Sequence, residues 1–137
     1  MTLRRSVECW LTHADGEILL LHVPPSASLP QGFWQPLTGG VEAAEKPLQA
    51  AVRDVREKTG QQVDPAAFRF MDDGVRVQVS ADFEVVKSLY VVELPSREIA
   101  TAPAAHDDHR WMATGEVGAL LHWQSNRETW QRISALL

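Results

Sequence analysis

Alternating apolar and polar positions predict several β-strands along the chain. Apolar side chains stand at every second position from Val7 to Leu11, and the run EILLLHV at 17–23 is rich in residues that favour strands. Because the turn signal Asp15-Gly16 separates these two runs, we expect them to form a hairpin. A second alternating run at 75–79 and the segment DFEVVKSLYVVEL at 82–94 predict two more strands, the latter long.

A helical pattern replaces this alternation between residues 47 and 59. Leu48, Val52 and Val55 recur at the spacing of one helix face, so we expect all three to be buried. The segment starts with a proline, which suits the first turn of a helix. Gly60 follows it and suits the left-handed position at which many helices end. The sequence therefore predicts a helix over 47–59.

Loops, short strands and a helical end complete the expected fold. The segments at 24–32 and 101–109 are rich in turn formers, and Gly74 is expected in a connection. Short strands are expected in FWQPLTGG at 33–40 and in RWMA at 110–113. The C-terminal segment has a capping-box pattern at Ser125 and Glu128, followed on one helix face by Trp130, Ile133 and Leu137. Strands around an early helix, with a helical tail, indicate an α/β or α+β fold.

The composition is that of one globular domain spanning residues 1–137. Hydrophobic residues make up 45% of the chain and charged residues 23%, which argues against disorder. The net charge of −5 disfavours binding to nucleic acid. Cys9 is the only cysteine, which excludes an intrachain disulfide and a zinc site built on several thiolates.

The cellular location is predicted from what the sequence lacks. Glu8, His13 and Asp15 interrupt the apolar run near the N-terminus, unlike the core of a signal peptide. No apolar run approaches the roughly 20 residues that a membrane-spanning helix needs. We therefore expect a soluble, cytoplasmic protein without a membrane partner.

The stretch from Gly39 to Gln61 contains a spaced set of glycines, acids and an arginine. It resembles the Nudix box, whose pattern is G-x5-E-x7-R-E-U-x-E-E-x-G-U with U an apolar residue. The matching residues are Gly39, Glu45, Arg53, Val55, Glu57 and Gly60. The flanking segments FWQPLTGGVE and SNRETWQRI are also similar to those of bacterial dihydroneopterin triphosphate pyrophosphohydrolases. The resemblance covers most of the chain and implies an α/β/α sandwich with a mixed β-sheet.

The resemblance also implies a chemistry. Nudix enzymes hydrolyse a pyrophosphate linked to another group, and carboxylates on one helix hold Mg²⁺ or Mn²⁺ that neutralises the phosphates. Carried over by position, Asp54 and Glu57 match acids at the metal site, and Gly39 matches backbone beside it. Glu45 and Arg53 match residues that brace the loop and the helix. The predicted catalytic set is therefore Glu45, Arg53, Asp54 and Glu57, with Asp54, Glu57 and Gly39 as metal ligands.

The substrate would lie against further residues near the box. Trp34, Gln35, Gly39, Gly40 and Lys58 are the candidates for substrate contacts. Gln35 has the groups to read the edge of a base or a pterin, or to pair with backbone instead. Core packing is the default interpretation for most of the five tryptophans. Stacking on a substrate ring is considered only for Trp34.

Several positions depart from the family pattern. Lys58 occupies the second position of the family's Glu-Glu pair, and a protonated ammonium cannot ligate a metal ion. Asp54 has a shorter side chain than glutamate, and Gln61 replaces an apolar residue. Ala105 stands where many relatives have a glutamate. After the second strand, where relatives often have a phosphate-binding arginine, this chain has His22-Val23. Mg²⁺ or Mn²⁺ is therefore expected to bind weakly, if at all.

Two clusters have competing interpretations. Asp54 and Lys58 form either a solvated i,i+4 pair or a metal site that has lost a ligand. The HDDH segment at 106–109 is interpreted as a solvated loop and strand start, and alternatively as a new metal site. In a strand its side chains would alternate between two faces, which disfavours a metal site.

Three functions follow from these observations. The first is a pyrophosphohydrolase that acts on a nucleoside or pterin triphosphate, with activity reduced by the altered box. The second is a binding module that keeps the cleft without hydrolysing, with Lys58 in place of a metal charge. The third, a pyrophosphohydrolase of RNA 5′ ends, is disfavoured by the acidic balance of the chain. The oligomeric state is left open.

Overall fold

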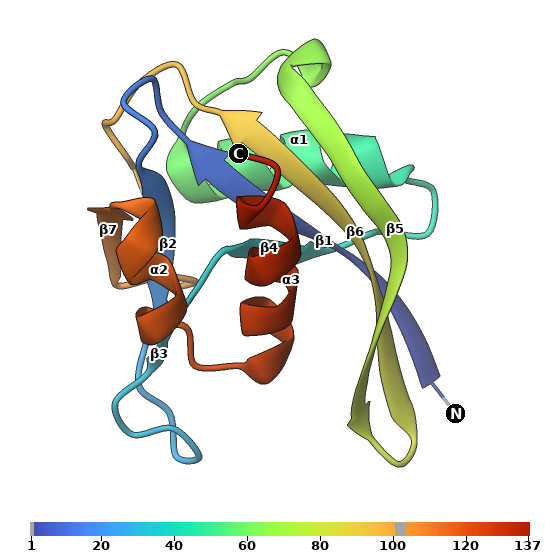
Figure 1. Ribbon diagram of the computed structural model, residues 1–137. Coiled ribbons are helices and arrows are strands. Elements are labelled where there is room, and N and C mark those ends of the chain that lie inside the picture. The colour runs from blue at the N-terminus through green and yellow to red at the C-terminus, as the bar shows by residue number, and fades with distance from the viewer. Residues whose placement is uncertain (1, 101–103) are drawn as a thin grey trace.

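A mixed β-sheet forms the centre of the molecule (Figure 1). The computed structural model describes residues 2–100 and 104–137. The strands are β1 (Thr2–Thr12), β2 (Ile18–Val23), β3 (Phe33–Gln35), β4 (Leu37–Gly40), β5 (Phe68–Ser80), β6 (Phe83–Glu93) and β7 (Asp108–Met112). They run in the order β3-β2-β1-β6-β5, with β4 also paired to β1 and β7 to β2. Because β1 and β6 are parallel and the other pairs antiparallel, the predicted mixed sheet is confirmed.

Helices cover both faces of this sheet. They are α1 (Pro47–Thr59), α2 (Thr114–Leu120) and α3 (Gln124–Ser134), and a short 3-10 helix, η1 (Pro65–Ala67), precedes β5. Helix α1 lies on one side of the strands, and α2 and α3 lie on the other (Figure 1). The predicted α/β/α sandwich is therefore confirmed. No helix among residues 2–100 and 104–137 is long and apolar enough to cross a membrane.

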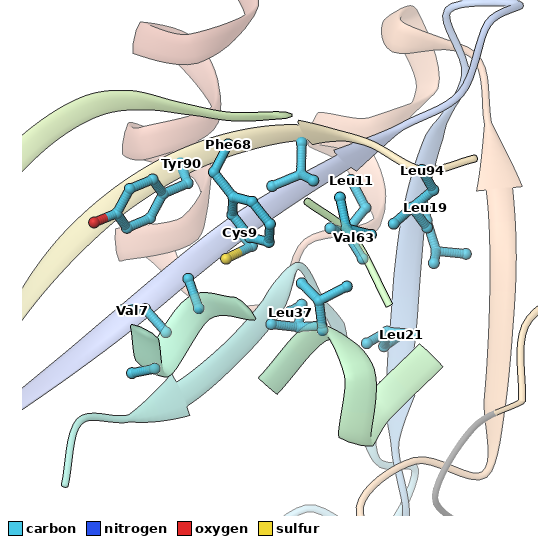
Figure 2. Packing of buried hydrophobic residues seen from close by; sticks show 14 residues of the cluster. Val7, Cys9, Leu11, Leu19, Leu21, Leu37, Val63, Phe68, Tyr90 and Leu94 are labelled. Carbon is cyan, nitrogen blue, oxygen red and sulfur yellow. The ribbon is translucent and has the colours of Figure 1, made fainter. Parts of the chain in front are cut away.

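The core is divided by the alternation of side chains along β1. Cys9 and Leu11 point into the cluster under α1, where Figure 2 shows them with Leu37 and Tyr90. Trp10 points to the opposite face, into the cluster beneath α2 and α3. One strand therefore supplies side chains to both halves of the core, as its period of two requires.

The pairing of β1 also positions the functional site. One edge of β1 pairs with β6 along its whole length. The other edge is shared, because Ser6–Cys9 pair with β4 whereas Leu11 and Thr12 pair with β2. Strand β4 and its two glycines therefore lie beside the middle of β1, and they contact Arg53, Asp54 and Lys58 in the second half of helix α1.

Helix α1 has the predicted bounds, but its buried face is shifted. It ends at Gly60, whose φ of 78° is the left-handed conformation that glycine favours. Val55 is fully buried and Val52 half-buried, whereas Leu48 is exposed. The prediction for Leu48 is wrong because this residue stands in the first turn, over a shallow surface hollow of about 280 Å³ instead of the sheet.

The C-terminal half differs from the expectation in three places. Helix α2 has no counterpart in the prediction. Helix α3 begins at Gln124, whose side chain binds Glu128, so Glu128 does not serve the predicted capping box with Ser125. Trp130 and Ile133 are buried as expected, but the helix ends at Ser134 and Leu137 is exposed.

Two further expectations about loops need correction. Gly74 does not lie in a connection: it is inside β5, at an irregularity in the pairing with β6, and its φ of 70° fits that distortion. Of the expected loop at 101–109, residues 101–103 lie outside the described residues. His106 is buried instead of solvated, and Asp108 already belongs to β7.

Candidate functional site

A hydrogen-bonded brace joins the loop after β4 to helix α1. The guanidinium of Arg53 donates to both carboxylate oxygens of Glu45, at 2.8 and 2.9 Å, and to the carbonyl oxygen of Gly40 at 3.0 Å. It also donates to Glu57, one turn along the helix, at 3.2 Å. The bonds from Arg53 lower the pKa of Glu45 to about 2, so this carboxylate stays ionised at neutral pH. Strand, loop and helix are thus held together.

Asp54 lies on the inner face of α1, directly against β4. Its side chain is 4% exposed, and a Cβ atom at Gly39 would collide with its carboxylate. Gly39 is therefore required here because the helix and the strand approach so closely. Burial raises the pKa of Asp54, while the charge and the hydrogen bond of Lys58 oppose that rise.

Lys58 places its ammonium group between α1 and β4. Its Nζ atom lies 3.2 Å from Oδ1 and 3.3 Å from Oδ2 of Asp54. The same atom donates a hydrogen bond to the carbonyl oxygen of Thr38. Because the Lys58 side chain is 20% exposed and that of Asp54 almost inaccessible, this pair is not a solvated surface contact.

These residues do not fit a divalent metal ion as they stand. Both oxygens of Asp54 face the ammonium of Lys58, a positive charge that would repel a second cation. Glu57 is half-exposed and paired with Arg53. Among the described residues, no three His, Cys, Asp or Glu side chains are grouped so that they could hold an ion.

The glycines, Asp54 and Lys58 form part of a cleft of about 640 Å³. Residues from β1, β5, β6 and the start of α3 complete its walls. The lining consists of the charged residues Arg4, Asp54, Glu57, Lys58 and Lys87, the polar residues Ser6, Gln35, Thr38, Ser125 and Asn126, the apolar residues Val77, Val79, Phe83, Val85 and Trp123, and Gly39 and Gly40. The cleft is therefore mixed in character, with both charges and an apolar wall.

A buried carboxylate organises the far side of this cleft. Glu8 on β1 is fully buried, and its Oε1 accepts hydrogen bonds from Lys87 at 2.7 Å and from Asn126 at 2.8 Å. Its Oε2 accepts from Thr129 at 2.7 Å and from Trp10 at 3.1 Å. Four donors thus compensate one buried charge, as burial of a carboxylate requires. The network ties α3 to β1 and β6.

Asn126, which lines the cleft, has a buried amide oxygen. Its amide nitrogen is bound to Glu8, and its Oδ1 is buried with no hydrogen-bond partner in the described part of the chain. Trp123, three residues earlier, lines the same cleft and is 43% exposed. This part of the cleft therefore presents the aromatic ring of Trp123.

The structure brings most of the predicted site residues together. Gln35 lines the cleft and donates a hydrogen bond of 3.3 Å to the Thr38 hydroxyl. Trp34 is not part of the lining: its ring packs against His22 with centroids 4.8 Å apart and carries the Arg110 guanidinium 5.0 Å from its centroid. The position of Trp34 thus agrees with packing and not with stacking on a substrate. Glu45 and Arg53 lie behind the cleft as a brace.

The departures from the box pattern have structural explanations. Gln61 donates to the carbonyl oxygens of Ser96 and Glu98, both at 2.9 Å, and so fixes a loop instead of filling a core. His22 is paired with Asp107 at 2.6 Å, so it cannot serve the cleft. His106 is 2% exposed, and burial and then the nearby Lys58 charge lower its pKa to about 4.

The cleft residues that the sequence prediction missed include Arg4, Lys87, Trp123 and Asn126. They come from β1, β6 and the α3 region, which are far apart in the sequence. One local signal for this wall was the position of Glu8. In the alternation along β1, Glu8 falls on the same face as Trp10, which is in the core. A carboxylate at such a position needs buried partners.

Several known proteins share sequence with this chain. An octanoyltransferase from Myxococcus xanthus is 30% identical over 121 residues, which are 88% of this chain and 33% of that protein. The nucleoside triphosphatase NudI from Salmonella agona is 35% identical over 82 residues, which are 58% of this chain and 57% of that protein. The chain thus spans about a third of the first relative and a little over half of the second.

Solved structures share the fold. The dihydroneopterin triphosphate pyrophosphohydrolase of E. coli superposes with a TM-score of 0.76 at 22% identity and full coverage of both chains. The NUDIX domain of Shewanella oneidensis NrtR, complexed with ADP ribose, gives a TM-score of 0.79 at 15% identity, covering 99% of this chain and 89% of that one. The NUDIX domain family model matches residues 2–133, and with this match the chain belongs to the NUDIX domain family, as the box residues predicted.

Proposed function

We propose that the protein is a pyrophosphohydrolase that acts on a nucleoside or pterin triphosphate. The observation that carries this proposal is the brace from Arg53 to Glu45 and Gly40, which holds the acids of α1 and the glycine strand at one cleft. In this family that arrangement is used to hydrolyse phosphoric anhydrides. One water molecule would cleave one anhydride bond, giving the monophosphate and pyrophosphate.

The dimensions and lining of the cleft support a substrate with a ring and a phosphate chain. A volume of about 640 Å³ lies within the usual range of small-molecule sites. The apolar wall and Trp123 suit a flat ring. The names of NudI and of the dihydroneopterin enzyme point to the same two substrate classes.

The contribution of a divalent ion is the open part of this proposal. Because Lys58 lies against both oxygens of Asp54, we expect Mg²⁺ or Mn²⁺ to bind weakly, if at all. The Lys58 ammonium would partly supply the positive charge that phosphates require. The same contact favours a second candidate, a nucleotide-binding module that has kept the cleft and lost hydrolysis.

Formation of monophosphates from a panel of substrates tests the proposal. Nucleoside triphosphates, dihydroneopterin triphosphate and nucleoside diphosphate sugars are incubated with the protein in Mg²⁺, Mn²⁺ or EDTA, and the monophosphate products are separated by anion-exchange chromatography. The Glu57→Gln variant should lose activity, whereas Glu116→Gln, on the exposed surface of α2, should not. If folded protein forms no monophosphate from any substrate, the hydrolase proposal is wrong. Retained binding without hydrolysis would establish the second candidate.

A further inference from the structure

The charges in the cleft are paired, with one exception. Lys58 lies against Asp54, Lys87 is bound to Glu8, and Glu57 is bound to Arg53. Arg4 is the remaining charged residue of the lining, and within residues 2–100 and 104–137 its guanidinium has no carboxylate or other hydrogen-bond partner. Three cationic groups line the cleft, but only Arg4 has a charge that is not already balanced.

The position of Arg4 follows from the geometry of β1. Ser6 pairs with Gly40 of β4, and Arg4 is two residues earlier, so its side chain shares the face of the strand that carries Ser6 and Glu8. That face is turned toward the cleft, where all but Glu8 contribute to the lining. The guanidinium lies against Gly40 so closely that a Cβ atom there would collide with it.

Gly40 itself is fixed from the other side. Its carbonyl oxygen accepts the 3.0 Å hydrogen bond from Arg53, so the strand segment under Arg4 cannot shift easily. Arg4 therefore has a rigid support beneath it, although its own side chain is exposed to solvent. A planar guanidinium with free N–H groups on a fixed support is suited to bidentate binding of a phosphate.

We propose that Arg4 is the principal phosphate-binding residue of the cleft and that it holds a phosphate chain without a divalent ion. This inference rests on the proposed function only in assuming a phosphorylated ligand. Lys58 contributes a second, partly neutralised charge beside the same glycines. His22 cannot take this role from β2, because it is paired with Asp107 and packed on Trp34.

Binding of inorganic tripolyphosphate in the presence of EDTA tests this proposal. Calorimetry and thermal shifts are measured for wild type, Arg4→Gln and Arg4→Lys. The matched control is Arg5→Gln, since Arg5 is also exposed but alternates to the opposite face of β1. We expect wild type to bind, Arg4→Gln to bind about tenfold more weakly, Arg4→Lys to fall between them, and Arg5→Gln to match wild type.

Three results would overturn the proposal. Wild type could fail to bind tripolyphosphate in EDTA, or bind it only when Mg²⁺ is added, or Arg5→Gln could lose as much affinity as Arg4→Gln. Unchanged unfolding temperatures of the ligand-free variants would show that each protein is folded. This experiment measures binding alone, so a failure to bind tripolyphosphate would not change the result of the hydrolysis assay. Conversely, a protein that binds through Arg4 but hydrolyses nothing would refute only the proposed hydrolysis.

Discussion

The ammonium of Lys58 lies 3.2 Å from the carboxylate of Asp54 and also binds the carbonyl oxygen of Thr38. This one side chain therefore bridges helix α1 and strand β4 at the place where the glycine strand meets the acids. Its charge stabilises a carboxylate that burial would otherwise destabilise. The lysine that interrupts the box pattern is thus a structural link as well as a change in chemistry.

Replacing Arg53 by alanine should destabilise the fold. Glu45 and the carbonyl oxygen of Gly40 would lose their donor in a partly buried loop, which costs about 1–3 kcal/mol. Arg56→Ala is the control, because Arg56 lies on the exposed side of the same helix. Chemical denaturation measures the free energy of unfolding of both variants. Equal stability of the two would mean that the brace carries no folding energy.

Gly39→Ala should be more disruptive than Gly115→Ala. The added Cβ atom would push the buried carboxylate of Asp54 away from Lys58, and such overpacking costs about 1–3 kcal/mol. Gly115→Ala, in α2 with open space around its Cα, should be neutral or slightly stabilising. Thermal unfolding of the two variants checks this difference, and a harmless Gly39→Ala would contradict the close packing.

Local signals explain which parts of the fold were predictable. Helix α1 is bounded by Pro47 and Gly60, and both act through their own backbone restrictions without help from the rest of the chain. The brace was predictable from the resemblance, because Glu45 and Arg53 belong to one continuous motif. The predicted burial of Leu48 was wrong because helical spacing shows on which face of the helix a residue lies but not how far the sheet extends beneath that face.

The other wall of the cleft depends on residues that meet only in three dimensions. Lys87 and Asn126 reach Glu8 across 79 and 118 positions of the sequence. No period of two or 3.6 residues encodes such a convergence. The sequence gives no local sign of the role of Arg4, because nothing near it in the chain shows that Gly40 will lie beneath it.

Loss of the Lys87 charge should destabilise the protein strongly. Lys87→Met leaves the fully buried Glu8 without its cationic partner, and breaking such a pair costs about 3–5 kcal/mol. Thr129→Val removes one neutral donor from the same carboxylate and should cost only about 1–3 kcal/mol. Urea denaturation measures the free energy of unfolding of both variants. A smaller effect for Lys87→Met would show that the other donors suffice.

Stability should fall as the pH drops from about 6.5 to about 4. The pKa of His106 is lowered to about 4 in the folded state, so in this window the unfolded chain binds a proton that the folded chain does not. The expected loss is about 1–3 kcal/mol and should shrink in His106→Gln. The lowered pKa of Glu45 also makes stability fall with decreasing pH, but only below about pH 4.5, the ordinary pKa of this group. A His106→Gln curve parallel to wild type would reject this assignment.

Restoring a carboxylate at position 58 should raise the affinity for divalent ions. Lys58→Glu removes the ammonium beside Asp54 and adds a possible ligand, a charge change of −2. Without metal, the crowded acids should lower stability by about 1–3 kcal/mol. Ala105→Glu adds a second acid, and its effect should couple with the first if both act on one ion. Mg²⁺-induced shifts of the unfolding temperature are measured for wild type, both single variants, the double variant and Lys58→Met. Comparison of Lys58→Glu with Lys58→Met separates the effect of an added ligand from the effect of losing the lysine charge. Equal shifts for Lys58→Glu and Lys58→Met would show that charge removal alone is sufficient.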